Sequence, residues 1–155
     1  MIKVFVYYIA KQTQDISEAI CQEFALLCGG FGVQLEFINA FCKTIKEGQK
    51  VNAKLAQASY SQVFLKSFKN HQYRIALAPQ GKVVDSYGFA ELLQNKTEIV
   101  FFIGGAYGLE ESFLQQCHQC VSLSNLTLSH KVAKVVLSEQ IYRGFGLLNH
   151  HPYHK

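Results

Sequence analysis

Ile99-Val-Phe-Phe-Ile103 is an unbroken apolar run that leads directly into a glycine turn, Gly104-Gly-Ala-Tyr-Gly108. An apolar run of this kind, rich in β-branched and aromatic residues, predicts a buried β-strand over residues 98–103. Glycines after such a strand let the main chain turn tightly and approach a ligand closely. Because open α/β sheets bind ligands beyond the carboxyl ends of their strands, this turn is a candidate ligand site.

Strand-like and helix-like segments alternate on both sides of this run. Further strands are expected at residues 2–8, 31–37, 74–78 and 120–123, the third of them closed by Pro79-Gln-Gly81. Helices are expected at residues 16–28, 51–68, 88–95, 109–118 and 129–147, from apolar periodicity and from caps at Asp15 and at Asp85 or Ser86. The first helix has one apolar face, made of Ile16, Ile20, Phe24 and Leu27. The alternation predicts an α/β fold with a mostly parallel sheet flanked by helices.

The size and composition of the chain indicate one globular domain. It has 155 residues, 49% of them hydrophobic, with 12 Phe and 8 Tyr, which excludes a disordered protein. We therefore expect a single domain over residues 1–155. The longest apolar runs fall well short of the ~18–20 residues that span a bilayer, and no signal-peptide cleavage site follows the first strand. These features predict a cytoplasmic protein without a membrane anchor.

Five cysteines are an odd number in a chain without an export signal, which favours reduced thiols over a disulfide framework. Cys117-His-Gln-Cys120 has the CxxC spacing of a redox motif or of half a zinc site. It ends a predicted helix instead of opening one, and no second CxxC supplies the other two ligands. We interpret these cysteines as packing residues and expect no metal.

Basic side chains concentrate near the carboxyl terminus. Residues 131–155 carry four cations against the single acid Glu139, a net charge of +3; the cations are Lys131, Lys134, Arg143 and Lys155. The whole chain has 15 basic and 11 acidic side chains, a net charge of +4, so residues 1–130 are nearly neutral in sum. Affinity from phosphate contacts grows with the number of cations, so a net charge this modest argues against strong binding to arbitrary RNA.

The glycine turn does not match the common nucleotide-binding motifs. Gly104-Gly105-x-x-Gly108 is not GxGxxG, no acidic residue stands about 20 positions further on to hold a ribose, and no P-loop is present. A tight turn between a strand and a helix also needs glycine for purely structural reasons. The turn alone therefore does not identify the ligand.

A polar segment between the last strand and the last helix offers further ligand contacts. It contains Ser122, Ser124, Asn125, Thr127, Ser129 and His130. The alternative interpretation is a helix entry in which Ser124, Thr127 or Ser129 only caps the helix, a contribution of about 1 kcal/mol. We favour a ligand-binding wall for the segment as a whole.

Three residues could act on a substrate. His130 could be a base or an RNA contact, although a histidine in the first turn of a helix is often only a surface residue. Arg143 could contact phosphate, but Glu139 precedes it by four residues, a helix pair worth only ~0.2–0.5 kcal/mol that could also orient the guanidinium. The tail, His150-His-Pro-Tyr-His154-Lys155, fits an RNA or a partner subunit better than a metal ion.

Four motifs occur in order in the second half of the chain. Leu77, Gly81, Ser86, Phe89 and Ala90 match L-x-x-x-G…S-x-x-F-A, and residues 102–108, with Phe101 before them, match F-x-I-G-G-x-x-G. Residues 122–130 match S-x-S-x-M/L-T-x-P-H except at Ser129, and residues 139–143 with 152–154 match E-Q-x-Y-R…Y-H. Together they resemble the SPOUT methyltransferases of the RlmH type, over about residues 74–155. Ser129 replaces a proline, Lys134 an arginine and Ala78 an aspartate, and the first half of the chain lacks the Gly-Lys usual after the first strand.

The resemblance implies an α/β fold with a C-terminal trefoil knot that binds S-adenosylmethionine, and an active site completed in a homodimer. It implies methylation of N3 of a pseudouridine in 23S rRNA on the assembled ribosome. Carried over by position, the cofactor site is Leu77, Gly104, Gly105, Leu123, Ser124, Asn125, Leu126, Thr127 and Leu128.

The expected catalytic residues are His130 and His154 as proton acceptors and Arg143 as the stabiliser of an anion. The residues expected to contact rRNA are Lys131, Lys134, Tyr153 and Lys155. Two alternatives stay open, a non-catalytic ribosome-binding SPOUT protein and a SPOUT enzyme that methylates a ribose 2'-hydroxyl.

Overall fold

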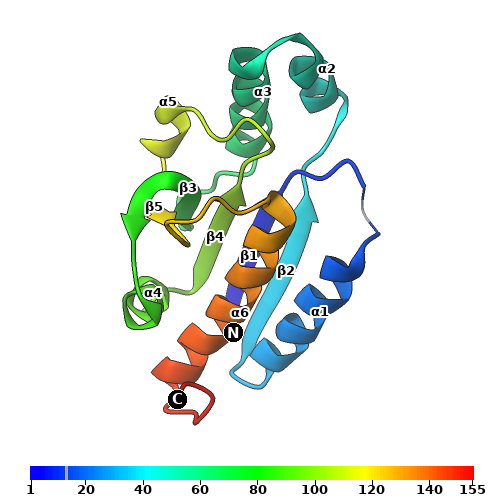
Figure 1. The fold of residues 1–155 in the computed structure, drawn as a ribbon. Helices are drawn as coiled ribbons and strands as arrows, with labels where there is room; N and C mark the ends of the chain where they lie inside the picture. The colour runs from blue at the N-terminus through cyan, green and yellow to red at the C-terminus, as the bar shows by residue number, and fades with distance from the viewer. Residues whose placement is uncertain (13) are drawn as a thin grey trace.

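The computed structural model describes residues 1–12 and 14–155. Strands and helices alternate along most of this chain (Figure 1). The strands are β1 (Ile2–Tyr8), β2 (Val33–Asn39), β3 (Tyr73–Val83), β4 (Glu98–Ile103) and β5 (Gln119–Ser122). The helices are α1 (Ile16–Gly29), α2 (Lys43–Val51), α3 (Ala53–Leu65), α4 (Ser86–Leu93), α5 (Glu111–Leu114) and α6 (His130–Leu148).

The five strands form one sheet in the order β2-β1-β4-β3-β5, and every pair of neighbours is parallel. This arrangement confirms the predicted α/β class with a parallel sheet. Parallel strands end at the same edge of a sheet, so the segments that follow β3, β4 and β5 start close together. The trefoil knot stays a prediction.

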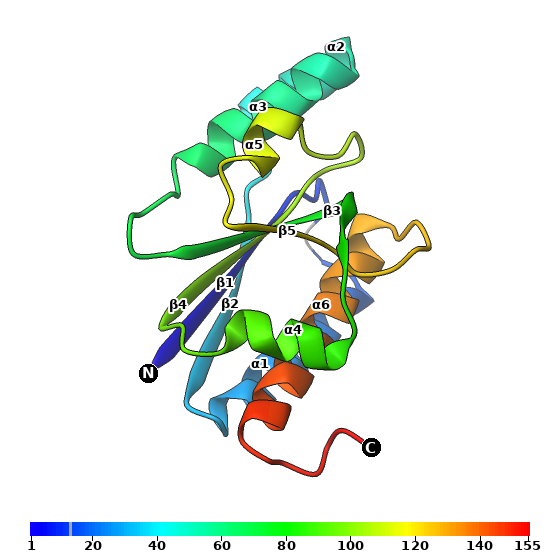
Figure 2. The same ribbon diagram turned by 90° about the vertical axis from the view of Figure 1, so that its left-hand side faces the viewer.

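Helices cover both faces of the sheet, with α1, α4 and α6 on one side and α2, α3 and α5 on the other (Figure 2). The central strand β4 supplies both cores, because its side chains alternate between the faces. Phe101 packs in the core under α6, and Phe102 packs under α3 against the ring of Phe64, with ring centroids 5.0 Å apart. Burial on both faces explains why β4 is apolar from Ile99 to Ile103, and its predicted bounds are confirmed.

The sequence prediction of a single helix that begins at residue 51 is wrong, because helix α2 precedes it. Two helices are present, and Asn52 separates them by accepting a hydrogen bond from the Leu55 amide with its side chain at 2.8 Å. The sequence of α2 is mostly polar, and Ile45 is its one buried residue. A helix with so narrow a buried face leaves no apolar period to detect.

Strand β3 is longer than predicted and passes through Pro79 and Gly81 instead of ending in a turn there. Leu77 and Lys82 both lie opposite Val121 of β5, so the residues between them form a bulge. A β-carbon at Gly81 would stand 2.7 Å from main-chain atoms of Val121. The close passage of β5, a contact between distant parts of the chain, explains the glycine.

Two helices differ in detail from their predictions. In α1 the buried residues are Ser17, Cys21 and Cys28, whereas the predicted inward residue Ile16 is 83% exposed. Small side chains let α1 approach α6 closely, and the Ser138 hydroxyl lies 3.3 Å from Cys21 Sγ. Helix α5 has only four residues, against ten expected. Among the described residues, none of the helices combines the length and apolar character needed to cross a membrane.

Candidate functional site

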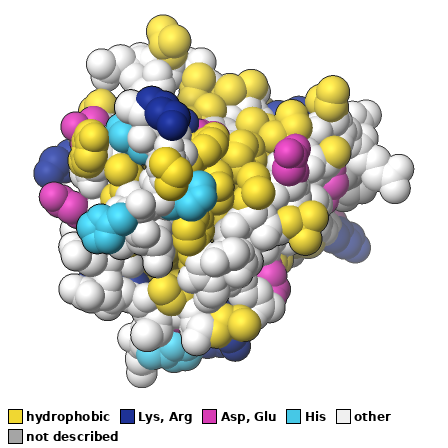
Figure 3. All heavy atoms as spheres, turned by 90° about the horizontal axis from the view of Figure 1, so that it is seen from below, with side chains coloured by type: hydrophobic (Ala, Val, Ile, Leu, Met, Phe, Trp, Pro, Cys, Tyr) yellow, Lys and Arg dark blue, Asp and Glu magenta, His cyan; other side chains and the backbone are white. Residues whose placement is uncertain are grey.

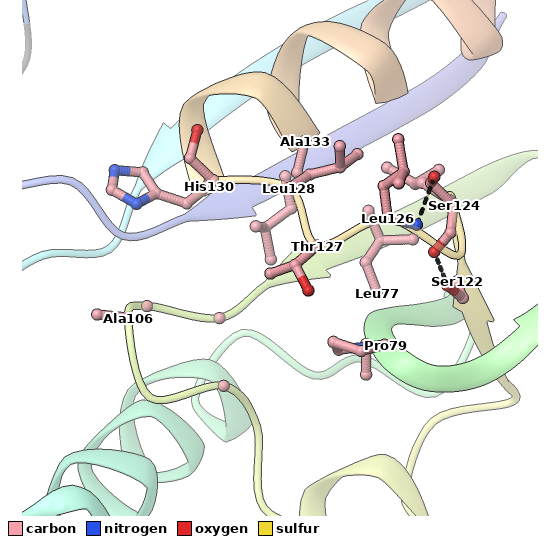
Figure 4. Close-up of a pocket in the computed structure, with 17 residues that line it drawn as sticks. Leu77, Pro79, Ala106, Ser122, Ser124, Leu126, Thr127, Leu128, His130 and Ala133 are labelled. Atoms are coloured by element: carbon pink, nitrogen blue, oxygen red, sulfur yellow. Dashed lines mark hydrogen bonds between the residues drawn. The ribbon is translucent and has the colours of Figure 1, made fainter.

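A pocket of about 430 Å³ lies beyond the carboxyl ends of β3, β4 and β5 (Figure 4). Three segments and the first turns of α6 form its walls. They contribute Leu77, Ala78 and Pro79; Ile103, Gly104, Gly105, Ala106 and Gly108; Ser122, Leu123, Ser124, Leu126, Thr127, Leu128, Ser129 and His130; and Ala133. The pocket is therefore at the place where the sequence predicts a ligand site.

The glycine turn closes the lower side of the pocket and is held from below by α3. The Gly108 amide donates to the Gly105 carbonyl at 3.0 Å, and Gly108 has φ +74°, a conformation that side chains disfavour. A β-carbon at Gly105 would lie 2.4 Å from the Tyr60 hydroxyl oxygen. Glycine at this position agrees both with a purely structural turn and with a ligand site, because it allows the tight turn and exposes main chain to the pocket.

Serine hydroxyls fold the segment between β5 and α6 into the upper wall. The Ser122 hydroxyl donates to the Ser124 carbonyl at 2.8 Å, and Ser124 Oγ accepts from the Leu126 amide at 2.9 Å. Ser129 caps α6 by accepting from the Val132 amide at 3.3 Å, so the capping interpretation is right for this residue. The serines shape the wall and leave other groups to meet a ligand.

Thr127 and Leu128 provide those groups. Their main-chain amides make no hydrogen bond to any other described residue. In Figure 4 both residues lie on the side of the pocket opposite Ala106 and Pro79, and the Thr127 hydroxyl faces the space between. A ligand in the pocket would therefore meet unpaired donors on one side and apolar side chains on the others.

The structure brings together most of the cofactor residues expected from the resemblance. Those that line the pocket are Leu77, Gly104, Gly105, Leu123, Ser124, Leu126, Thr127 and Leu128. Asn125 is exposed and does not line it. The sequence prediction missed Ala78, Pro79, Ile103 and Ala133. The position of Pro79 depends on the bulge in β3, and Ile103 and Ala133 carry no signal beyond their place next to predicted residues.

His130 begins α6 and lies at the outer end of the pocket, away from Leu77 in Figure 4. Burial lowers the pKa of its imidazole below the usual 6.5, and the charges of Lys131 and Lys134 lower it further. The ring is therefore neutral at pH 7 and can accept a proton from a bound substrate.

Arg143 and His154 form a second cluster near the other end of α6. The Arg143 guanidinium donates two hydrogen bonds to Glu139 Oε1, one of them 3.0 Å long from Nε, and lies 3.1 Å from His154 Nδ1. The Tyr153 hydroxyl donates to the same Glu139 oxygen at 3.0 Å, and the guanidinium stacks on the Tyr153 ring. Glu139 thereby fixes the tail against α6, and its hydrogen bonds raise the pKa of Arg143.

Within one chain, the cluster of Arg143 and His154 lies far from the pocket. Arg143 follows His130 by thirteen positions in α6, which is about 20 Å along the helix axis. Neither Arg143 nor His154 lines the pocket. The three residues expected to be catalytic therefore belong to two sites within one chain.

The four residues expected to contact rRNA differ in their surroundings. Lys155 is exposed, Tyr153 packs on the tail cluster, and Lys131 is 3.2 Å from Asp15 while staying half exposed. Lys134 is only 5% exposed, and its ammonium lies 4.1 Å from the centre of the Tyr8 ring and 3.9 Å from Glu18. This placement favours a structural role for Lys134 over the expected rRNA contact, which stays a prediction.

Cys117 of the CxxC motif lies between α5 and β5, and Cys120 lies in β5. Burial raises the pKa of the Cys117 thiol to about 12 and also raises that of Cys120. His118 Nδ1 accepts the Arg74 amide at 2.9 Å, and its ring stacks on Tyr73. Protonated thiols and an imidazole engaged in packing support the interpretation of this motif as structural.

Comparison with known proteins agrees with this geometry. A family model described as "Predicted SPOUT methyltransferase" matches residues 2–154. Proteins named ribosomal RNA large subunit methyltransferase H are similar along nearly their whole length. The one from Wolinella succinogenes is 46% identical over 154 residues, 99% of each chain. Those from Aliarcobacter butzleri and Helicobacter acinonychis are 44% and 45% identical, over 99% and 97% of each chain. The chain therefore belongs to the SPOUT methyltransferases, in the family of ribosomal RNA large subunit methyltransferase H.

Proposed function

We propose that this protein methylates N3 of a pseudouridine in 23S rRNA on the assembled ribosome, with S-adenosylmethionine as methyl donor. The observation that carries the proposal is the pocket at the ends of β3, β4 and β5, which lies in a chain of this family and is lined by the residues expected for the donor. Its relatives carry the name of an rRNA methyltransferase. Residues 1–155 act as one domain in the cytoplasm, where ribosomes work.

The pocket fits S-adenosylmethionine in size and chemistry. Its volume lies within the range of about 300–1,000 Å³ typical of small-molecule sites. Leu77, Ile103 and Leu126 offer apolar surface for an adenine ring. The amides of Thr127 and Leu128, unpaired within the described residues, would hydrogen-bond polar atoms of the ligand. When bound, this group supplies a methyl group made electrophilic by a positively charged sulfur.

The residues of the chain then need to hold the base of the pseudouridine and remove its N3 proton. Fixed positioning of the attacking nitrogen can lower the barrier by several kcal/mol, about 7–11 in the best cases. The neutral imidazole of His130, at the outer end of the pocket, accepts the proton. Arg143 stabilises the negative charge that develops on the imide, and His154 is a second proton acceptor next to it.

Arg143 and His154 lie about 20 Å along α6 from His130, so we propose a homodimer in which the tail of one chain completes the pocket of the other. Figure 3 shows hydrophobic side chains gathered across the middle of the face seen from below. A dimer would cover exposed apolar surface of this kind. In the dimer, Tyr153, Lys155 and Lys131 would contact the rRNA beside the pocket.

Mass spectrometry of rRNA from a deletion strain tests the proposed reaction. We expect one methylated pseudouridine to disappear and to return when the purified protein and S-adenosylmethionine are added to ribosomes from that strain. Loss of a ribose-methylated nucleoside instead would identify a 2'-hydroxyl methyltransferase. Calorimetry with S-adenosylmethionine separates enzyme from non-catalytic ribosome-binding protein, because the absence of binding would contradict methyl transfer.

A further inference from the structure

The most basic part of the chain runs from α2 to the residues just after α3. Residues 43–69 carry six lysines against the single acid Glu47, a net charge of +5, and four of these lysines lie within the α2–α3 hairpin. Residues 131–155 carry +3, so residues 43–69 are more basic than the carboxyl-terminal tail. The near-neutral sum over residues 1–130 concealed this concentration, because residues 1–42 and 70–130 are each acidic, at −2.

Three of these lysines share the exposed face of α2. Lys43, Lys46 and Lys50 follow one another at spacings of three and four residues, which places them on one side of a helix. Ile45 is fully buried on the other side. Lys43 is 3.8 Å from Glu47 in a highly exposed pair, which leaves it available to other anions. Lys46 and Lys50 have no ion pair with any other described residue, and both are exposed.

Close packing fixes this face relative to α3. A β-carbon at Gly48 would lie 2.8 Å from the Leu55 carbonyl oxygen, so only glycine allows the two helices to approach so closely. The Tyr60 hydroxyl donates to Gln49 Oε1 at 2.5 Å and ties the end of α2 to α3. The lysines are therefore presented by a rigid element.

The same hairpin supports the glycine turn of the pocket. Gln57 Nε2 donates to the Tyr107 carbonyl at 2.7 Å, and Tyr60 fills the space beneath Gly105. Figures 1 and 2 show α2 beyond the carboxyl ends of the strands, and the pocket lies beyond the same ends of β3, β4 and β5. The distance between the lysines and the pocket is thus set by direct contacts.

We propose that Lys43, Lys46 and Lys50 of α2 form a phosphate-contact surface for the RNA that enters the pocket. Lysine ammonium groups are point charges without base specificity, and contacts to phosphates set the register of an RNA without reading its sequence. This inference rests on the proposed function, because the RNA held here is the methylation substrate. The surface positions the RNA backbone while the pocket acts on one base.

The double variant Lys46→Gln/Lys50→Gln tests the surface. With ribosomes from a deletion strain and saturating S-adenosylmethionine, we expect KM for ribosomes to rise roughly tenfold at moderate salt. The slope of log KM against log salt should become shallower by roughly 1 for each lost phosphate contact. The kcat and the affinity for S-adenosylmethionine should stay unchanged, since neither side chain lines the pocket.

Lys3→Gln/Lys96→Gln is the matched control. It removes the same charge at the amino-terminal end of the sheet, where Lys3 of β1 lies opposite Glu98 of β4. We expect wild-type KM from the control. Equal KM increases in both double variants, or no increase in the α2 variant, would overturn the proposal. The α2 variant should melt like the wild type, whereas the control should lose at most about 1 kcal/mol with the cation–π contact between Lys96 and Tyr73.

The outcomes separate this proposal from the proposed function. If the wild type methylates ribosomes and the α2 variant does so with an unchanged KM, only the phosphate-contact surface is refuted. If the wild type transfers no methyl group, the proposed function fails. Co-sedimentation of the wild type and both double variants with the same ribosomes then tests independently whether the α2 lysines contact RNA. Equal binding of all three proteins would refute the phosphate-contact surface.

Discussion

The ring of Tyr60 occupies the space into which a side chain at position 105 would project. A β-carbon built on Gly105 lies 2.4 Å from the Tyr60 hydroxyl oxygen and 2.6 Å from the ring carbon that carries it. Tyr60 is fully buried, and its hydroxyl is engaged with Gln49, so the ring has no free direction in which to move. Tyr60 of helix α3 thereby requires glycine at position 105, in the floor of the pocket.

Gly105→Ala should therefore damage the pocket before it damages the fold. The added methyl group pushes the glycine turn upward into the space for the ligand, and overpacking of this kind costs about 1–3 kcal/mol of unfolding free energy. We expect calorimetry to show at least a roughly tenfold loss of affinity for S-adenosylmethionine. Gly29→Ala is the control, because a β-carbon there meets nothing within 4 Å. Wild-type affinity in Gly105→Ala would contradict the close contact.

Arg143→Ala should abolish methylation and leave binding of S-adenosylmethionine unchanged. The guanidinium lies outside the pocket of its own chain, so its removal does not alter the walls that hold the donor. It would act on the uridine in the partner's pocket. Single-turnover methylation and calorimetry on the same preparation give the two values. Unchanged turnover would remove Arg143 from the catalytic residues.

Glu139→Gln should weaken the same step through Arg143. The carboxylate accepts from Arg143 and from the Tyr153 hydroxyl on one oxygen, and from Gln140 Nε2 on the other at 2.7 Å. An amide in its place loses an acceptor oxygen and the charge, so the guanidinium and tail lose their fixed positions. We expect turnover to fall by roughly tenfold, since a hydrogen bond to a charged group contributes about 1.5–3 kcal/mol. Glu91→Gln, an exposed acid on α4, is the control, and equal effects would refute a positioning role.

The sequence predicts the parts of this site that depend on local physical chemistry. The apolar run of β4 and the caps at Asp15, Asp85 and Ser129 all occur as expected. The glycine turn and the polar segment after β5 lie together because both follow neighbouring parallel strands. Each of these features follows from one stretch of chain and the rules of its element.

The features that the sequence does not predict depend on contacts between distant segments. Helix α2 is polar, and its packing on α3 requires Gly48 to meet Leu55. The bulge in β3 exists because β5 passes against Gly81. The buried state of Lys134 depends on Tyr8, from a strand more than a hundred residues earlier. None of these contacts leaves a local pattern.

The rate of methyl transfer should depend on pH through His130. Burial holds its pKa below 6.5, so the imidazole remains the neutral, proton-accepting form down to that range. We expect a flat profile from about pH 8 to below 6.5, followed by a decline as pH falls through the lowered pKa. The His130→Gln variant should transfer methyl groups more slowly, and its rate should not show this decline at low pH. A decline centred above pH 6.5, or the same decline in the variant, would contradict the assignment.

The same shift predicts the direction of a stability change. The unfolded chain takes up a proton on this histidine at a higher pH than the folded chain, so unfolding becomes easier as pH falls below about 6.5. From pH 7.5 to pH 5.5, the unfolding free energy of the wild type should therefore fall relative to that of His130→Gln. Urea denaturation at the two pH values measures it, and a shift of opposite sign would show that the pKa is raised.

Lys134 should behave as a structural residue when its charge is removed. Its carbon chain is buried between α1, α6 and Tyr8, and only its ammonium meets Glu18. Lys134→Met keeps a long apolar stem, so we expect a loss of less than about 1.5 kcal/mol in unfolding free energy and an unchanged KM for ribosomes. Lys134→Ala removes the stem and should cost about 1–3 kcal/mol.

Lys131→Met is the matched comparison, because Lys131 sits one turn away in a half-exposed pair with Asp15. A surface pair contributes at most about 1 kcal/mol, so its loss should change stability little. If Lys131 contacts rRNA as proposed, its variant should raise KM for ribosomes while Lys134→Met does not. A raised KM in Lys134→Met at unchanged stability would instead restore the RNA contact that its burial argues against, since the ammonium would then have to leave the Tyr8 ring when the substrate binds.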